Sequence, residues 1–230
     1  RSGGSMVTEI IASSSAAVSL SGIDDFDIFS RLAKNLKKKL PEGYIAKTPD
    51  TIHYEYKELR KLFLTEPELL GVWSIRHPYD IALSKIYRGQ LKSVGGDQDF
   101  RIAPDATIDG CLNNINKMTN IYMSAKEEFP DRIRVIKMED IIKNFKDTVK
   151  MLCEYLKISY EDKMETFYTR MRNPFKRQRY NRIDSRELDK WKNWETIYSG
   201  YFMKNKINAI SLFLNLEKPA KLFGYELFRV

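Results

Sequence analysis

Short apolar runs alternate along the chain with longer stretches in which apolar residues recur at the helical spacing. The short runs predict strands at 43–47, 69–75 and 132–137. The longer stretches predict helices at about 5–15, 24–39, 51–64, 79–90, 107–128, 139–157, 160–171, 186–191 and 195–213. Because strands and helices alternate, we expect an α/β fold of three layers (α/β/α), with helices on both faces of a central parallel sheet.

The composition fits a single globular domain over residues 1–230. Of the 230 residues, 43% are hydrophobic, which is enough for a substantial core. No apolar run approaches the roughly 20 residues that cross a bilayer, so no transmembrane segment is predicted. The two cysteines, Cys111 and Cys153, have no metal-ligand spacing and form no disulfide framework, and we expect two reduced core thiols.

The net charge of +8 favours an anionic ligand or partner. One basic cluster, Lys37–Lys39, ends a predicted helix and is typical of a solvated helix terminus. The other extends from Arg170 to Lys192 and has little apolar periodicity, so it predicts a basic loop at a binding site. A specific nucleic-acid partner is not favoured, because the sequence has no zinc-finger spacing and no RNA-recognition aromatic motif.

The most informative segment lies at the end of the predicted strand 69–75. Arg76 follows the strand, Pro78 opens the next helix, and Asp80 lies in its first turn. Ser84 comes two helical turns after Arg76, so we expect both side chains over one crevice at the carboxyl end of the strand, where open α/β sheets bind ligands. A planar donor fork beside a hydroxyl suits a phosphate monoester.

A second phosphate-binding pattern lies at the start of the sequence. Residues 1–5 read Arg-Ser-Gly-Gly-Ser and lead into the predicted helix 5–15. Glycines let backbone amides approach an anion closely, and a helix N-terminus adds unpaired N–H groups and a favourable dipole. The pattern lacks the Lys-Ser/Thr pair of a Walker loop for ATP.

The two patterns resemble motifs of the sulfotransferase family that uses 3′-phosphoadenosine-5′-phosphosulfate (PAPS). That family has an R/K-S-G-T/S-T/S loop for the 5′-phosphosulfate and R-x-P-x-D-x-x-x-S for the 3′-phosphate. The first motif is matched by Arg1, Ser2, Gly3 and Ser5, with Gly4 as a departure. The second motif is matched in full by Arg76, Pro78, Asp80 and Ser84.

Four further segments resemble motifs of the same family and follow in the family's order, so the resemblance covers essentially the whole chain. They are Tyr-Ile-Ala-Lys-Thr-Pro at 44–49, the strand-to-helix element at 135–142, Asp-Lys-Trp-Lys-Asn-Trp at 189–194 and Phe-Gly-Tyr-Glu at 223–226. The resemblance implies a P-loop-like fold and transfer of a sulfuryl group from PAPS to a hydroxyl or amine. It implies an acceptor such as a carbohydrate or peptide, adenosine 3′,5′-bisphosphate (PAP) as product, and no metal.

The resemblance also implies which residues hold the donor nucleotide. Arg76 and Ser84 are expected to bind the 3′-phosphate, and Arg1 to neutralise charge on the leaving phosphate. The backbone around the 5′-phosphosulfate is expected to come from Ser2, Gly3, Gly4, Ser5 and Met6. The remaining phosphate contacts are expected from Arg182, Arg186 and Lys190, with Trp191 either beneath the nucleotide or in the core.

For catalysis, the resemblance implies one lysine and leaves the general base open among several residues. Lys47 is placed by the resemblance near the transferred sulfuryl group, and its alternative is a solvent-facing lysine at a strand end. Cytosolic members have a histidine after Lys-Thr where this chain has Pro49, so the sequence is more similar to the bacterial or Golgi-type branch. Candidates for the general base are Asp24, Asp25 and His53, and the alternatives are helix N-terminal carboxylates and a surface histidine.

The first residues affect the expected domain boundary. A phosphate loop normally follows a strand and none precedes Arg1, so we expect an N-terminally truncated domain that lacks its first strand and any targeting segment. A cytoplasmic location is the default expectation, and the lumen of the secretory pathway is the alternative.

Two other classes of function compete with the sulfotransferase interpretation. A P-loop-type kinase needs a Walker lysine after the loop and carboxylates for Mg²⁺, and Gly4-Ser5-Met6 provides no lysine. A non-catalytic nucleotide- or polyanion-binding domain is consistent with the positive charge, and salt-sensitive binding that ignores PAP is its signature.

Overall fold

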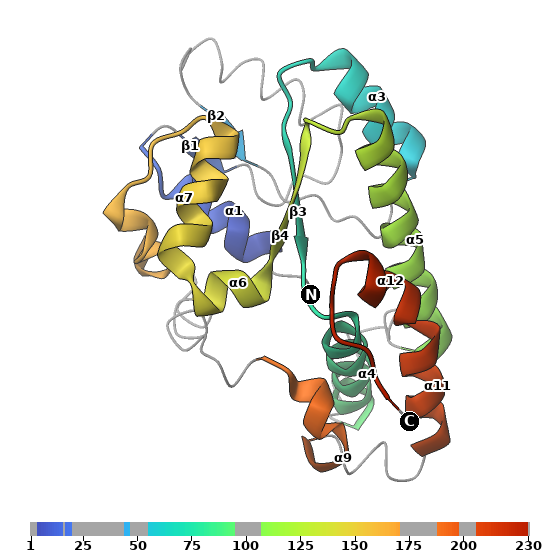
Figure 1. Cartoon of the computed structure of the whole chain (residues 1–230). Helices are drawn as coiled ribbons and strands as arrows, with labels where there is room; N and C mark the ends of the chain where they lie inside the picture. The colour runs from blue at the N-terminus through green and yellow to red at the C-terminus, as the bar shows by residue number, and fades with distance from the viewer. Residues whose placement is uncertain are drawn as a thin grey trace. The chain divides into compact units, whose positions relative to one another are not determined.

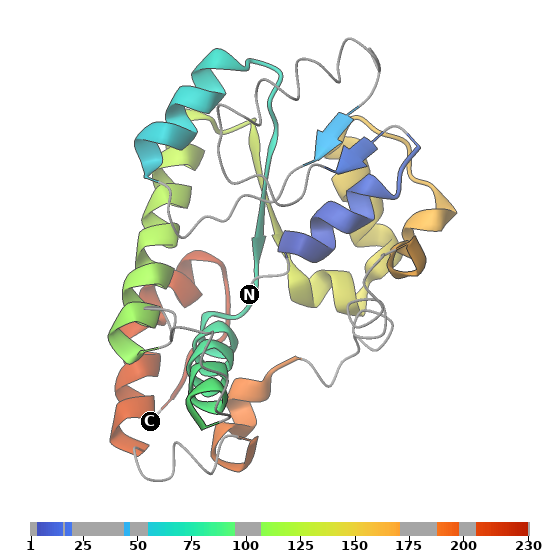
Figure 2. The same cartoon turned by 180° about the vertical axis from the view of Figure 1, so that it is seen from behind.

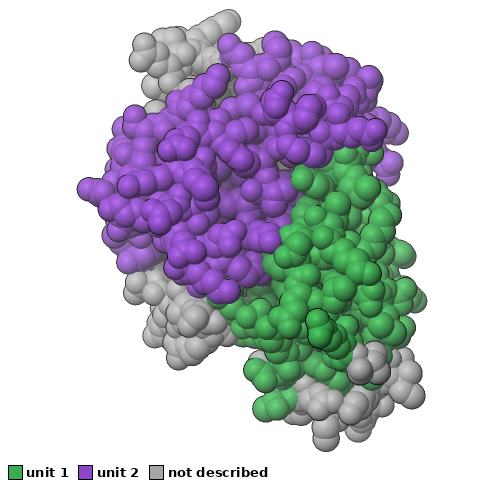
Figure 3. Space-filling model, viewed as in Figure 1, with its two compact units in different colours: residues 1, 76–124, 186–230 green, residues 2–75, 125–185 purple. Residues whose placement is uncertain are grey.

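The computed structural model describes residues 4–15, 17–19, 44–46, 55–94, 107–170, 188–197 and 206–229. The chain divides into two compact units, each with its own hydrophobic core (Figure 3). Unit 1 comprises residues 76–124 and 186–230, and unit 2 comprises residues 2–75 and 125–185. The single domain expected over residues 1–230 stays a prediction.

The strands that the structure describes all belong to unit 2 and form two parallel pairs (Figure 1). β3 (Gly71–Ile75) pairs with β4 (Ile133–Lys137), and Gly71 lies opposite Ile133 in the register. β1 (Ala17–Ser19) pairs with β2 (Tyr44–Ala46). Parallel pairing requires a long crossover, and between β3 and β4 the chain forms two helices, α4 (Pro78–Val94) and α5 (Ile108–Glu128).

Helices cover both faces of the β3–β4 pair within unit 2. α1 (Gly4–Ala12), α6 (Met138–Lys143) and α7 (Phe145–Leu156) lie on one side, and α3 (Tyr56–Thr65) lies on the other (Figures 1 and 2). Alternate strand residues point to opposite faces, so Ile136 of β4 joins α1 in one cluster while Phe63 of α3 approaches Gly71 from the other side. The predicted three-layer arrangement is therefore confirmed in this unit.

The core of unit 2 is mainly aliphatic, because α1 and α7 each turn one apolar face toward the strands. Its buried residues are Met6, Val7, Ile10, Ile136, Ile141, Val149, Leu152, Cys153, Ile158, Met164 and Phe167. Hydrogen bonds from a charged side chain to the backbone add to this packing. The guanidinium of Arg132 donates to three backbone carbonyls, those of Phe63 (2.8 Å), Glu66 (2.6 Å) and Leu69 (3.0 Å).

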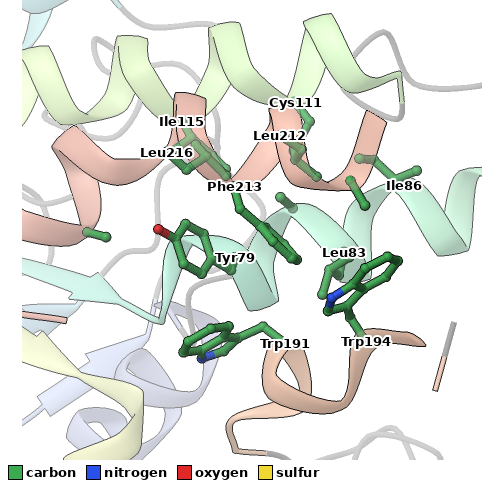
Figure 4. Packing of buried hydrophobic residues seen from close by; sticks show 13 residues of the cluster. Tyr79, Leu83, Ile86, Cys111, Ile115, Trp191, Trp194, Leu212, Phe213 and Leu216 are labelled. Carbon is green, nitrogen blue, oxygen red and sulfur yellow. The ribbon is translucent and has the colours of Figure 1, made fainter. Parts of the chain in front are cut away.

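In the part of unit 1 that the structure describes, the regular elements are all helices, and residues 225–229 after the last helix have no regular structure. Besides α4 and most of α5, it contains η6 (Lys190–Asn193), α9 (Trp194–Ile197), α11 (Lys206–Asn215) and α12 (Glu217–Leu222). Its core is rich in aromatic rings. Figure 4 shows Phe213 reaching from α11 toward α4, with Tyr79 and Trp194 on either side of its ring.

The predicted strands lie within two residues of the observed β2, β3 and β4. The three-residue strand β1 and helix α12 are missing from the sequence predictions. The predicted helix 139–157 is broken at Asn144, whose backbone leaves the helical region (φ −136°, ψ 55°) and whose carbonyl accepts the N–H of Thr148 as α7 begins. The two cysteines are free and buried, as predicted.

Three other helix predictions need comment. The predicted helix 160–171 is wrong, because this segment forms two 3₁₀ turns, η3 (Asp162–Met164) and η4 (Phe167–Arg170). The predicted helix 195–213 corresponds to parts of α9 and α11, and residues 198–205 between them lie outside the described ranges. The predicted helix 24–39 lies outside them as well.

Candidate functional site

Residues Arg76–Asp80, here called the Arg76 turn, connect the end of β3 to α4. Pro78 is the first residue of α4, where its missing N–H costs no hydrogen bond. The N–H of Ile81 donates to the carbonyl of His77 at 3.0 Å and starts the helical ladder. Asp80 lies in the first turn, where the helix dipole favours a carboxylate. The local sequence thus fixes where the helix begins and sets Arg76 just before it.

The guanidinium of Arg76 is held by a buried ion pair inside this turn. Its Nη2 lies 3.3 Å from Oδ2 of Asp80, and the two side chains are only 10% and 0% exposed. The other carboxylate oxygen of Asp80 accepts the backbone N–H of Trp191 at 2.8 Å. Asp80 therefore connects Arg76 to Trp191 of η6, which lies 111 positions after Asp80 in the chain.

His77 is the second buried polar residue of the turn, with 3% of its surface exposed. Its Nε2 lies 3.0 Å from the carbonyl oxygen of Glu226, and because a carbonyl can only accept, Nε2 carries the proton. The backbone N–H of Tyr79 points to Nδ1 at 3.4 Å. Burial lowers the pKa of His77 to about 4, so the ring is neutral at neutral pH.

Three aromatic rings surround the imidazole of His77. The ring centroids of Tyr79, Trp191 and Tyr225 lie 4.8, 4.8 and 4.7 Å from its own. Three segments that the sequence analysis treated as separate motifs, at 76–84, 189–194 and 223–226, therefore meet around one side chain. Sequence reasoning matched Asp80 to a motif and gave His77 no role, so the contacts of both side chains are additions from the structure.

Trp191 is buried, with 5% of its surface exposed, and its ring packs edge-on to Tyr79 at 5.1 Å. This position favours the core alternative for Trp191 over the nucleotide-stacking alternative, which stays a prediction. Among the described residues, none accepts a hydrogen bond from its Nε1–H. A buried donor of this kind costs stability and is more common near functional sites than in ordinary cores.

Ser84 and Lys190 are half-buried residues of unit 1. Ser84 follows Asp80 by four positions in α4, so the two side chains share one face of the helix. Lys190 is the first residue of η6 and directly precedes the N–H that binds Asp80. The structure thus places Arg76, Ser84 and Lys190 in one unit, with Arg76 bound directly to Asp80.

The first residues of α1 belong to unit 2. The helix begins at Gly4, and no acidic residue lies in its first turn. Met6 is buried in the core of unit 2, so only its backbone amide is available to an anion. The remaining predicted loop residues, Arg1, Ser2 and Gly3, lie outside the described ranges.

Other predicted site residues also lie outside the described ranges. Lys47 directly follows the last residue of β2 in the sequence. The other residues in this group are Asp24, Asp25, His53, Arg182 and Arg186. Their assigned roles stay predictions.

An arginine and a hydroxyl at the end of a parallel strand are typical of α/β enzymes that bind a phosphorylated ligand. A model of the sulfotransferase family matches residues 1–162 of the 230-residue chain. The chain therefore belongs to the sulfotransferase family. A model of polyphosphate kinase 2 matches residues 117–212, a smaller part of the chain.

Two solved structures support the same fold. The sulfotransferase domain from the curacin biosynthetic pathway has a TM-score of 0.55 at 20% identity, covering 86% of this chain and 68% of that one. The sulfotransferase domain from the Synechococcus PCC 7002 olefin synthase has a TM-score of 0.54 at 14% identity, covering 86% and 65%. This chain therefore spans about two thirds of the length of each. No curated protein sequence matches it significantly.

In the part of the chain that the structure describes, no three His, Cys, Asp or Glu side chains are grouped so that they could hold a metal ion. None of the described helices combines the length and the apolar character that a membrane span requires.

Proposed function

We propose that the protein transfers a sulfuryl group from PAPS to a hydroxyl or amine of an acceptor molecule. The observation that carries this proposal is the Arg76 turn, in which a buried guanidinium precedes a half-buried serine hydroxyl on α4 in a chain of the sulfotransferase family. The 3′-phosphate distinguishes PAPS from ATP, and these two groups suit a phosphate monoester.

The charge around the turn is consistent with a phosphate ligand. Asp80 offsets the charge of Arg76, and Lys190 directly precedes the residue whose backbone N–H binds Asp80. A guanidinium near a serine hydroxyl on the same turn and helix favours an anionic ligand over a neutral one. In this proposal Arg76 and Ser84 bind the 3′-phosphate, with Lys190 as an additional cation.

The start of α1 is the proposed binding element for the 5′-phosphosulfate. Its free N–H groups come from Gly4, Ser5 and Met6, and the absence of acidic residues in the first turn leaves their positive potential intact. Arg1, Ser2 and Gly3 extend this element by their position in the sequence. Gly4 in place of a hydroxyl residue removes one side-chain donor, so the backbone must supply more of the contacts.

The reaction exchanges one sulfur–oxygen bond for another bond to sulfur. The bond from sulfur to the bridging oxygen of the 5′-phosphate breaks, and a bond to the acceptor oxygen or nitrogen forms. We assign Lys47 and Arg1 to the charge that grows on the leaving phosphate, where electrostatic stabilisation has its largest effect. The acceptor proton passes to a general base, for which Asp24, Asp25 and His53 are the candidates.

A transfer assay with PAPS labelled in its sulfuryl group tests this proposal. We expect labelled product and one equivalent of PAP, without added magnesium, from some member of a panel of carbohydrates and tyrosine peptides. Lys47→Ala should lower turnover by about 10²-fold, whereas Lys57→Ala, at an exposed position of α3, should not change it. A protein that binds neither PAPS nor PAP contradicts the proposal.

A second candidate function is phosphoryl transfer, and the match to polyphosphate kinase 2 over residues 117–212 is the observation that favours it. Magnesium-dependent turnover of ATP or polyphosphate is its signature. The same preparation serves both assays, so the two candidates are separated by which donor is consumed.

A further inference from the structure

The last described residues of the chain are hydrogen-bonded to the Arg76 turn. Residues Gly224–Phe228 are here called the closing segment. The imidazole Nε2–H of His77 donates to the carbonyl of Glu226 at 3.0 Å. The hydroxyl of Tyr79 accepts the backbone N–H of Phe228 at 3.3 Å. Two residues of the turn therefore hold the backbone of the closing segment at positions two residues apart.

Side chains strengthen the same connection. The ring of Tyr225 packs on His77, and the ring of Phe228 lies 4.9 Å from Phe213 in the core of unit 1. Nζ of Lys192, in η6, lies 2.6 Å from the carboxylate of Glu226. This last pair is exposed, so most of the connection depends on the buried imidazole and the aromatic rings.

Contacts with η6 hold the Arg76 turn in addition to those with the closing segment. Asp80 binds the guanidinium of Arg76 and the N–H of Trp191, as described above. The imidazole of His77 fills the space between Trp191 and Tyr225. The backbone of His77 cannot shift toward either ring without breaking a hydrogen bond or a ring contact. Because Arg76 is the adjacent residue, its backbone is held as well.

We propose that His77 is a positioning residue for 3′-phosphate binding, because its hydrogen bond to the closing segment fixes the backbone that carries Arg76. The inference rests on the proposed function, since it takes Arg76 as a ligand of the 3′-phosphate. His77 itself does not touch the nucleotide. It acts through Arg76. The closing segment therefore supports the donor site without contacting the nucleotide.

Two substitutions of His77 separate its hydrogen bond from its volume. The amide nitrogen of Gln can take the place of the imidazole Nε2, whereas the shorter Asn side chain reaches only the place of Nδ1. The readout is the ratio of the dissociation constants for adenosine 5′-phosphate and PAP, which differ only by the 3′-phosphate. We expect His77→Asn to lower this ratio about tenfold, and His77→Gln to keep it close to that of the wild type.

The ratio distinguishes positioning from a general loss of stability, because destabilisation weakens the binding of both nucleotides alike. Glu217→Gln, which removes an exposed ion pair with Lys221 in α12, is the matched control and should keep the wild-type ratio. An unchanged ratio in folded His77→Asn overturns the inference. Equal losses in the Asn and Gln variants also overturn it, because the hydrogen bond to Glu226 is then irrelevant.

If His77→Asn does not fold, Phe228→Pro provides the second test. It removes the N–H donated to Tyr79 together with the ring that packs on Phe213, and it leaves the residues of the turn unchanged. We expect a smaller fall in the ratio, and an unchanged ratio overturns the inference. A wild-type protein with no preference for PAP over adenosine 5′-phosphate contradicts the proposed function instead, whatever the variants do.

Discussion

The two units bury their polar groups in different ways. In unit 2, Arg132 donates to three backbone carbonyls and Glu161 accepts the backbone N–H of Ser15, and Glu139 is the one charged residue among those described in this unit that is buried (8% exposed). In unit 1 three polar residues, Arg76, His77 and Asp80, lie together inside an aromatic core and are at most 9% exposed.

Burying polar groups costs stability unless each finds a partner. Among the described residues, unit 2 buries one charged residue, whereas unit 1 buries an ion pair and an imidazole within one turn. The buried network of unit 1 is therefore better explained by function than by folding, because it holds a guanidinium in one place at the end of a strand. The comparison predicts large effects from changes inside the network of unit 1 and smaller ones elsewhere.

The largest effect is expected from Asp80→Ala. The change leaves the guanidinium of Arg76 and the N–H of Trp191 without their buried acceptor. We expect the free energy of unfolding to fall by about 3–5 kcal/mol, measured by urea denaturation. Asp80→Asn keeps the shape and one acceptor and should cost clearly less. Equal and small effects of both changes would mean that the network contributes little.

A pH dependence of stability is the next largest effect. Folding lowers the pKa of His77 from 6.5 to about 4, so the unfolded chain binds a proton more readily between these values. The stability that the neutral imidazole of His77 contributes is fully present above pH 6.5 and is lost as the pH falls toward 4. Between pH 7 and pH 5 it amounts to about 2 kcal/mol. His77→Gln should lack this part of the pH dependence, and an identical profile in the variant contradicts the assignment.

A packing change in unit 2 should have a moderate effect. A Cβ at Gly71 would lie 3.0 Å from Cζ of Phe63, whose ring is stacked on Phe129 and cannot easily move. We expect Gly71→Ala to lower the free energy of unfolding by about 1–2 kcal/mol and to leave the affinity for PAP per folded molecule unchanged. A selective loss of PAP affinity would show that the packing at Gly71 also supports nucleotide binding.

The smallest effect is expected at the surface of unit 1. Glu217 and Lys221 form an exposed ion pair at 3.3 Å on α12. Glu217→Gln should change the free energy of unfolding by less than about 0.5 kcal/mol. If Glu217→Gln lowered the free energy of unfolding as much as Asp80→Ala does, burial in the network would not explain the cost of the Asp80 change.

The sequence predicted the elements whose signals are local. The apolar runs before Arg76 and before Met138 gave β3 and β4, and Pro78 marked the start of α4. β1 was missed because three residues are too few for an apolar pattern. The break at Asn144 was missed because the residues on both sides keep the helical spacing.

For the candidate site, the sequence identified residues but not their connections. Arg76 and Ser84 could be found from a spacing of eight positions. The roles of His77 and Asp80 depend on partners more than 100 positions away, at Glu226 and Trp191, which no local pattern reveals. The spacing of four positions between Arg76 and Asp80 was the one local signal of an ion pair.

Calorimetric titration of the wild-type protein and of Arg76→Met with PAP and with adenosine 5′-phosphate tests the central claim most directly. We predict that the wild type binds PAP about 10- to 100-fold more tightly, as expected for charge-assisted hydrogen bonds to one phosphate. The variant should lose this preference while it still binds adenosine 5′-phosphate. Equal affinities of the wild type for both nucleotides, or a preference that survives in Arg76→Met, would contradict the account.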